Sequence, residues 1–203
     1  MVDSNKISAS LSQLLDNGSV VSLLLDEWRT KFDDLVQSNL PSFCMPVQWQ
    51  ADFDHGQQWW VAPIMINPDW DGLISQYPQQ ELQQLNKKLS TIYPQTHDHL
   101  SQFLTNNRIH YIAYSILFSG SILHYHKHDN PGHRKFHCLM HSTQRCGVMH
   151  TKRSEAGQPI KCIHHWMNPG EWITFNDNDY HSAWNLSLDS RTVLVIDYAS
   201  EVQ

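Results

Sequence analysis

The spacing of apolar residues changes after Asn107, from a helical period to alternation, and this change constrains the fold more than any other feature. Short apolar segments rich in Ile, Val, Tyr and Trp follow one another from there, and turns that contain glycine separate several of them. We expect strands over 108–118, 121–128, 135–141, 146–151, 160–166, 172–176 and 192–198. Short strands at such intervals are typical of an antiparallel sandwich or barrel.

The part of the chain before Asn107 is expected to be mainly helical. Apolar residues recur at helical spacing through 7–15 and 24–35. The segment 79–92 is amphipathic as well, and Pro94 is expected to end that helix. One exception is the apolar run over 59–66, which we expect to form a strand.

These expectations combine into one domain over residues 1–203. Its first part, 1–107, is a mainly helical support region with a strand near 59–66, and its second part, 108–198, is a jelly-roll core. A chain of 203 residues with 40% hydrophobic residues is long enough for one substantial core. The fold class predicted is mostly β with N-terminal helices.

Composition excludes several classes of partner and compartment. The net charge of -6 argues against a nucleic acid, because phosphate binding needs a basic face. A mean hydropathy of -0.47 without a long apolar run argues against a membrane span. The first residues form no secretory signal, and the four cysteines form no Cys-x-x-Cys pair, so we expect free thiols and a cytoplasmic location.

Histidines are concentrated in the second half of the chain, where ten of the fourteen lie between His124 and His181. On a regular strand His124, His126 and His128 share one face, while Leu123 lies on the other. A polar surface strand is the ordinary interpretation of a single such histidine. Three at alternate positions, together with the later His181, favour a metal site, because neutral imidazole binds iron, zinc, copper and nickel.

An arginine follows this last histidine at a spacing of ten residues. Arg191 begins the predicted final strand, and a hairpin can bring that position beside His181. A guanidinium group in a mostly uncharged barrel needs an anion, and its planar fork suits a carboxylate. The alternative is a surface arginine paired with Asp177 or Asp189.

Taken together, these residues resemble the aspartyl/asparaginyl β-hydroxylase family of Fe(II)/2-oxoglutarate oxygenases. Three spacings fit the family without a gap: Ser115 to His126, His126 to His137, and His181 to Arg191. The resemblance covers about ninety residues of the C-terminal half. Further matching positions are Tyr114, Ile116, Gly120, Gly170, Glu171, Phe175, Asp177, Trp184, Val195, Ile196 and Asp197.

The resemblance implies a double-stranded β-helix (jelly roll, cupin-like) that holds one Fe(II). By analogy His126 and His181 are iron ligands, and Arg191 binds the far carboxylate of 2-oxoglutarate with help from Ser115. His137 is implied to lie near the cosubstrate.

One family position is changed here. Lys135 stands where the family has an arginine that contacts the cosubstrate, and lysine keeps the charge but loses the bidentate fork.

The sequence leaves three alternatives for the third iron ligand. Oxygenases of this type usually have a carboxylate two residues after the first histidine, and this chain has His128 there. Either His128 is the third ligand, or it faces away and a water completes the site, or Asp129 reaches the iron. Same-face geometry favours His128 over Asp129. His124 is expected either to contact the substrate or to contact the iron-binding histidines without binding the iron itself.

The function expected is that of a 2-oxoglutarate-dependent hydroxylase that produces succinate and CO₂. Its substrate is expected to be of the aspartyl/asparaginyl type or a small acid, presented as a small molecule or peptide. The alternative is a cupin-like metal enzyme, or a metal-binding module, that does not use 2-oxoglutarate. Four aromatic residues either exclude water from the cavity or belong to the ordinary core: Phe136, Trp166, Trp184 and Tyr198.

Overall fold

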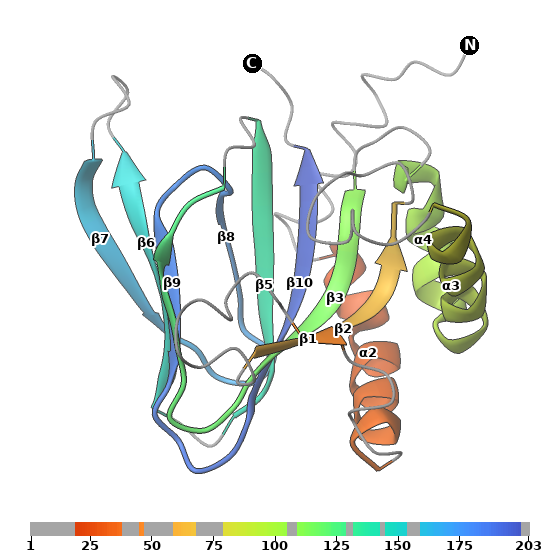
Figure 1. Cartoon of the computed structure of the whole chain (residues 1–203), viewed down its shortest axis with the longest axis horizontal. Coiled ribbons are helices and arrows are strands. Elements are labelled where there is room, and N and C mark those ends of the chain that lie inside the picture. The colour runs from red at the N-terminus through yellow and green to blue at the C-terminus, as the bar shows by residue number, and fades with distance from the viewer. Residues whose placement is uncertain are drawn as a thin grey trace.

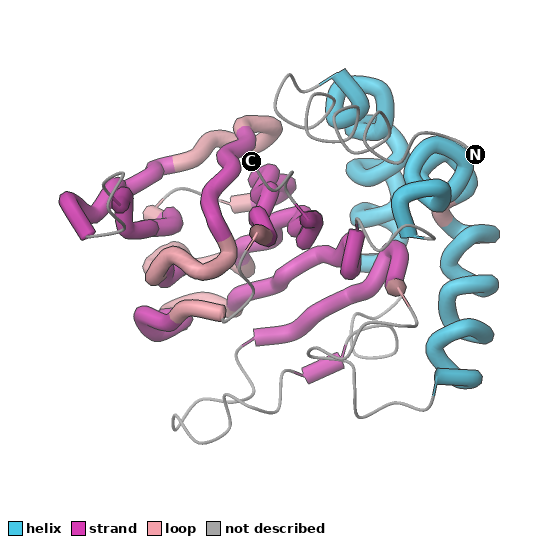
Figure 2. Tube along the Cα trace, turned by 90° about the horizontal axis from the view of Figure 1, so that it is seen from above, coloured by secondary structure: helices cyan, strands magenta, loops and turns pink. Residues whose placement is uncertain are grey.

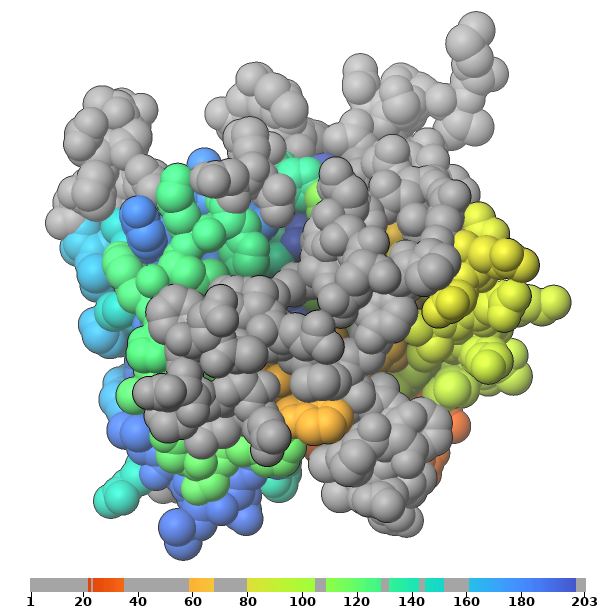
Figure 3. All heavy atoms as spheres, in the orientation of Figure 1, coloured from red at the N-terminus to blue at the C-terminus, as the bar shows by residue number. Residues whose placement is uncertain are grey.

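The computed structural model describes residues 19–37, 45–46, 59–67, 79–104, 109–128, 132–142, 145–153 and 159–199. The helix expected over 7–15, the thiol of Cys44 and the side chain of Asp129 lie outside these ranges. Two antiparallel sheets face each other, and three helices lie beyond one of them (Figures 1 and 2). The space-filling view of the same face shows α3 and α4 gathered on the side opposite the strands β6, β7 and β9 (Figure 3).

Ten strands build the two sheets. The larger sheet contains, in spatial order, β1 (Met45–Pro46), β2 (Trp59–Ile66), β3 (Ile109–Leu117), β10 (Arg191–Ala199), β5 (His133–His141) and β8 (Trp172–Asn176). The smaller sheet contains β4 (Ile122–His126), β9 (His181–Asn185), β6 (Cys146–Arg153) and β7 (Pro159–Trp166).

The eight strands from β3 to β10 form a double-stranded β-helix. They fill two layers in the orders β3-β10-β5-β8 and β4-β9-β6-β7, so the chain crosses repeatedly from one layer to the other. This is the arrangement of a jelly roll. The prediction of a mostly β, cupin-like fold with N-terminal helices is therefore confirmed, and the strand expected over 59–66 adds β2 to the edge of β3.

Among the described residues, three helices cover the outer face of the larger sheet: α2 (Ser19–Gln37), α3 (Gln79–Ile92) and α4 (Pro94–Leu104). Leu24 and Trp28 of α2 and Leu100 of α4 are fully buried against the sheet. Pro94 ends α3 as expected, but it also begins α4, because proline is well suited to the first position of a helix. The carboxylate of Glu27 in α2 accepts hydrogen bonds from the backbone N–H groups of Gln95 and Thr96, both at 2.9 Å, and so caps α4.

Alternation along β3, β5 and β10 separates an apolar outer face from an inner face that carries charged side chains. Tyr114, Phe136 and Leu194 point outward into the core beneath the helices. The residues at the alternate positions face the smaller sheet, and they include Arg191 and Lys135, which are almost completely buried. Buried charges of this kind need partners or ligands, so the inner face is suited to binding a ligand.

The described part of the chain also shows the state of three cysteines and the character of the helices. Cys138, Cys146 and Cys162 are free thiols. None of the described helices is long and apolar enough to cross a membrane.

Candidate active site

Three histidines meet between the two sheets at the junction of β4 and β9. His126 ends β4 and pairs in register with His181, which begins β9. His128 follows His126 at the same junction, and one ring nitrogen of each of the three histidines lies within 4.8 Å of the others. The rings of His126 and His181 are 4.4 Å apart, and those of His128 and His181 are stacked at 5.3 Å, measured between ring centroids.

Backbone contacts fix the orientation of two of these rings. His126 Nδ1 lies 2.6 Å from the carbonyl oxygen of His124, and His181 Nδ1 lies 2.8 Å from that of Asp179. A carbonyl oxygen only accepts, so each Nδ1 carries the proton and donates it. The Nε2 atom of each ring is then left with a lone pair, which is how metal-binding histidines are commonly held.

The surroundings keep all three imidazoles neutral. Burial lowers the pKa of His126 and His128, and for His128 the Lys135 ammonium adds to the effect and brings the pKa to about 4. Burial, followed by the proximity of His126, lowers the pKa of His181 well below its ordinary value. Neutral imidazole is the form that binds a metal.

The side chain of His124 does not share the face of His126 and His128 as expected, although its carbonyl oxygen does support His126 through the Nδ1 contact. The pairing of β4 with β9 shifts register between Leu123 and His126, which breaks the alternation at that point. Leu123 therefore lines the cavity with His126 and His128, while His124 is exposed. A β-bulge re-aims side chains in this way, and the sequence pattern alone does not reveal it.

A cavity between the sheets opens beside the three histidines. Trp59 and Val61, on β2, contribute to it, although no pattern in the sequence indicates that this early strand approaches the site. The cavity is lined by Trp59, Val61, Tyr111, Ala113, Ser115, Leu123, His126, His128, Lys135, His137, Val148, His181, Ala183 and Val195. Most of these side chains are apolar or aromatic, and such walls exclude water.

Arg191 lies on the inner face of β10, on the same side as the cavity residue Val195. Its side chain is 2% exposed, and its Nε and Nη2 atoms have no hydrogen-bond partner among the described residues. Burial lowers the pKa of Arg191 to about 10, an effect that the nearby Cys146 thiol opposes, so the guanidinium stays charged at neutral pH. The alternative of a surface ion pair with Asp177 or Asp189 is wrong, because the side chain is buried and no such pair forms among the described residues.

Ser115 and His137 flank the same strand. Ser115 pairs with Val193 in β10 from one side, and His137 pairs with Val195 from the other. The indole N–H of Trp59 donates to Ser115 Oγ at 2.8 Å, which leaves the serine hydroxyl proton available to a further acceptor. Burial, followed by the charge of Arg191, lowers the pKa of His137 well below its ordinary value.

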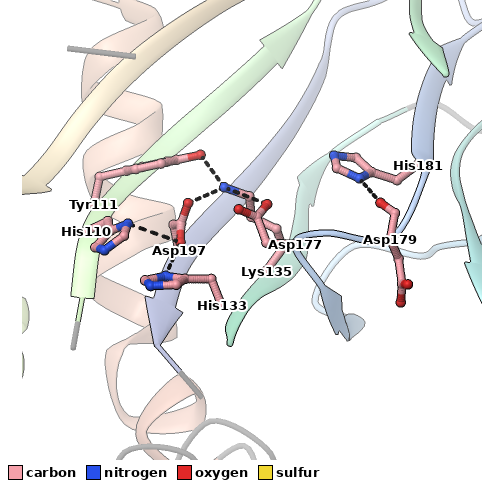
Figure 4. A network of polar contacts seen from close by, with 8 residues as sticks. All are labelled: His110, Tyr111, His133, Lys135, Asp177, Asp179, His181 and Asp197. Carbon is pink, nitrogen blue, oxygen red and sulfur yellow. Dashed lines mark hydrogen bonds and ion pairs between the residues drawn. The ribbon is translucent and has the colours of Figure 1, made fainter. Parts of the chain in front are cut away.

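Lys135 belongs to a buried ion network at the opposite end of the inner face (Figure 4). Its ammonium is paired with Asp197 Oδ2, lies 3.3 Å from Asp177 Oδ1 and donates to Tyr111 Oη at 3.3 Å. Burial acts to lower the pKa of Lys135, but the Asp197 carboxylate and its neighbours raise it above the ordinary value. Lys135 thus reaches the cavity while its charge is already engaged by two carboxylates.

The aromatic residues considered for the cavity lie elsewhere. Phe136 and Tyr198 are fully buried in the core beneath the helices, because they occupy outward positions of β5 and β10. Trp166 is 65% exposed, with its ring against Trp184 at the outer side of the smaller sheet. These four aromatic residues therefore belong to the core or the surface of the protein and do not line the cavity.

Comparison with solved structures finds partial matches at low identity. The protein TT1209 from Thermus thermophilus is 16% identical, with a TM-score of 0.36 over 47% of this chain and 76% of that chain. A predicted oxalate decarboxylase from Thermotoga maritima is 21% identical, with a TM-score of 0.35 over 49% and 75%. An oxalate oxidase is 15% identical, with a TM-score of 0.39 over 54% and 47%.

Comparison of sequences gives a clear assignment. A search of curated proteins finds no significant match. The family model described as aspartyl/asparaginyl beta-hydroxylase matches residues 48–201, so the likeness begins well before Ser115 and includes β2 with its cavity residues Trp59 and Val61. With its three clustered histidines, its buried arginine and this match over most of its length, the chain belongs to the aspartyl/asparaginyl β-hydroxylase family.

Proposed function

We propose that this protein is an Fe(II)- and 2-oxoglutarate-dependent hydroxylase. Its substrate is of the aspartyl/asparaginyl type or a small acid. The observation that carries the cosubstrate assignment is Arg191, a buried cation with two N–H positions that no described residue satisfies. A buried charge without a partner is costly, and a dicarboxylate cosubstrate supplies the missing acceptor.

The three histidines fit an iron centre. His126, His128 and His181 offer neutral imidazole nitrogens within 4.8 Å of one another, and such a donor set suits Fe(II). His126 and His181 are the two ligands that the family resemblance implies. We propose His128 as the third, because its ring is already turned toward the other two and burial keeps it neutral.

Arg191 and Ser115 fit the far carboxylate of 2-oxoglutarate. They lie on the inner faces of adjacent strands, two register positions apart in the β3–β10 pairing, within reach of a long side chain. Arg191 offers Nε and Nη2, which is the fork that binds a carboxylate through two hydrogen bonds, and Ser115 offers its hydroxyl proton. His137, between this carboxylate site and the histidines, contributes an uncharged, buried wall.

When bound, iron with 2-oxoglutarate and O₂ supplies oxidative decarboxylation to succinate and CO₂, coupled to insertion of one oxygen atom into a substrate C–H bond. The protein places the reactants and keeps water away. The apolar side chains of Val61, Ala113 and Val195 line the cavity beside the histidines, and we expect them to keep solvent from the reactants.

The substrate class follows from the family rather than from a contact. The role of Lys135 toward the cosubstrate is weaker than in relatives with arginine, since Asp197 and Asp177 already occupy its ammonium. We therefore expect the near carboxylate of 2-oxoglutarate to depend on the iron more than on Lys135.

Succinate formation tests the proposal directly. The purified protein is supplied with Fe(II), O₂ and 2-oxoglutarate, and succinate is measured with and without aspartyl- and asparaginyl-containing peptides. We expect slow turnover without substrate, which His181→Ala abolishes and His99→Ala, a change at an exposed helical histidine, preserves. A wild-type protein that binds iron but consumes no 2-oxoglutarate under any of these conditions is instead a metal protein of another kind.

A further inference from the structure

We propose a second site for a divalent transition metal, formed by His110, His133 and Asp197. One ring nitrogen of each imidazole and one carboxylate oxygen of Asp197 lie within 4.8 Å of one another. These residues come from the neighbouring strands β3, β5 and β10, and they are separate from the three histidines of the candidate active site. Two neutral imidazoles and a carboxylate are a common ligand set for zinc and other transition metals.

The distances suit a shared ion. His110 Nδ1 lies 3.7 Å from Asp197 Oδ1, and His133 Nδ1 lies 3.5 Å from the same oxygen. Ligand atoms of a tetrahedral zinc site are about 3.4 Å apart when each bond is about 2.1 Å long. Both contacts are longer than an ordinary hydrogen bond, and Figure 4 shows the two rings directing Nδ1 at one carboxylate.

A local irregularity of the strands creates this cluster. The pairing of β10 with β3 shifts register between Asp197 and Tyr198, so that Tyr111 pairs with Asp197, Ile109 pairs with Tyr198, and His110 is left in the bulge. Regular alternation would place His110 on the face opposite Tyr111. The bulge instead turns His110 onto the ring of His133, with the ring centroids 4.0 Å apart.

The charges nearby favour a cation at this position. Asp177 and Asp197 are both fully buried, and they share the single ammonium group of Lys135. Asp197 contacts the Lys135 ammonium through Oδ2 and directs Oδ1 toward the imidazoles, where the carboxylate oxygen can bind a cation.

The ion has a route to the site from the imidazole side. The side chains of His110 and His133 are 14% and 17% exposed, whereas Asp197 is completely buried. The protein then provides three ligands and leaves one tetrahedral position to solvent, and Asp197 links the site through Lys135 to the cavity.

Zinc titration of the whole chain tests the proposal. We expect two equivalents of Zn²⁺ to bind the wild type, one equivalent to bind His126→Ala/His181→Ala, and one to bind His110→Asn/His133→Asn. Loss of either ligand pair should weaken zinc binding at its own site by at least about tenfold. The proposed site is rejected if the folded His110→Asn/His133→Asn variant still binds two equivalents of Zn²⁺. It is also rejected if the wild type binds a single equivalent.

A second measurement needs no variant. Histidines of the wild type are modified with diethyl pyrocarbonate, with and without Zn²⁺, and located by mass spectrometry. We expect zinc to protect His110 and His133 as well as the active-site histidines. Zinc protection confined to other histidines, such as the closely spaced His150 and His165, rejects the assignment.

Discussion

The imidazole rings of His126 and His181 lie 4.4 Å apart between centroids, and each donates its Nδ1–H to a backbone carbonyl two residues earlier in the chain. The same local contact thus orients both rings from two different strands. Because β4 and β9 pair at these residues, the metal-facing edges of the rings are fixed by the sheet itself. The site needs little rearrangement to accept an ion, and this has consequences for the third ligand.

We predict that His128→Ala lowers iron affinity while His128→Asp retains most of it. Aspartate restores a ligand at the position where related oxygenases usually carry a carboxylate. Anaerobic Fe(II) binding, measured as the stoichiometry and dissociation constant of each variant, distinguishes them. Unchanged affinity in His128→Ala rejects His128 as a ligand and points to water or to Asp129.

The metal-free protein should lose stability as the pH falls from about 6.5 toward 4. The folded-state pKa values of His126, His128 and His181 lie below the ordinary value of about 6.5, so the unfolded chain binds more protons in this interval. Their contribution to stability is fully present above pH 6.5 and declines below it.

Thermal unfolding between pH 7 and pH 4.5 measures this dependence. We expect a shallower decline in the His126→Ala/His181→Ala variant, which has removed two of the groups. An equally steep decline in that variant contradicts the assignment of the effect to these histidines.

Removal of the ammonium at Lys135 should destabilise the fold strongly. Lys135→Met leaves the buried carboxylates of Asp177 and Asp197 without their cation, and the loss of one partner of a buried pair costs about 3–5 kcal/mol. Burial acts to raise the pKa of Asp197, but Lys135 and His133 hold it below its usual range, which shows how closely these charges depend on each other. Urea unfolding gives the free energies.

The double variant Lys135→Met/Asp197→Asn provides the control. It removes both members of the closest pair, so its cost should be smaller than the sum of the two single costs. Additive costs mean that the two residues contribute independently and contradict the ion network.

Two glycines should respond to alanine for different reasons. At Gly147 an added Cβ meets the Trp184 ring at 2.5 Å and the carbonyl oxygen of His165 at 2.6 Å, so Gly147→Ala should cost about 1–3 kcal/mol through overpacking. At Gly120 nothing lies within 4 Å, but φ is +74°, so Gly120→Ala should cost about 1 kcal/mol through backbone strain.

Trp184→Leu separates these two mechanisms. In a double-variant cycle measured by urea unfolding, it should reduce the cost of Gly147→Ala and leave that of Gly120→Ala unchanged. Equal reductions at both positions are incompatible with the close contact between Gly147 and the ring.

Much of the jelly roll could be predicted because its strands alternate visibly. The segments from 108–118 to 192–198 correspond to strands, since one face of each is apolar and packs beneath the helices or between the sheets. β9 was not expected, because five residues that include a polar Ser and Asn give too weak a pattern. That residues 1–203 form a single domain stays a prediction.

The candidate site was predictable in its residue types and less so in its geometry. Register shifts move Leu123 into the cavity in place of His124 and turn His110 toward His133, and such shifts depend on pairing between distant strands. The same is true of Trp59, which reaches Ser115 only because β2 pairs with β3. The periodicity of one segment carries no information about these long-range contacts.

Binding of 2-oxoglutarate to the iron-loaded protein under anaerobic conditions tests the central claim most directly. The visible charge-transfer absorption of the complex reports binding without turnover. We predict that the wild type develops this absorption. The control Arg29→Met, a change at an exposed arginine of α2, should leave the absorption unchanged. Arg191→Met should require at least about tenfold more 2-oxoglutarate for the same absorption, because a buried charge pair is lost. Equal affinity in Arg191→Met and wild type would contradict the account.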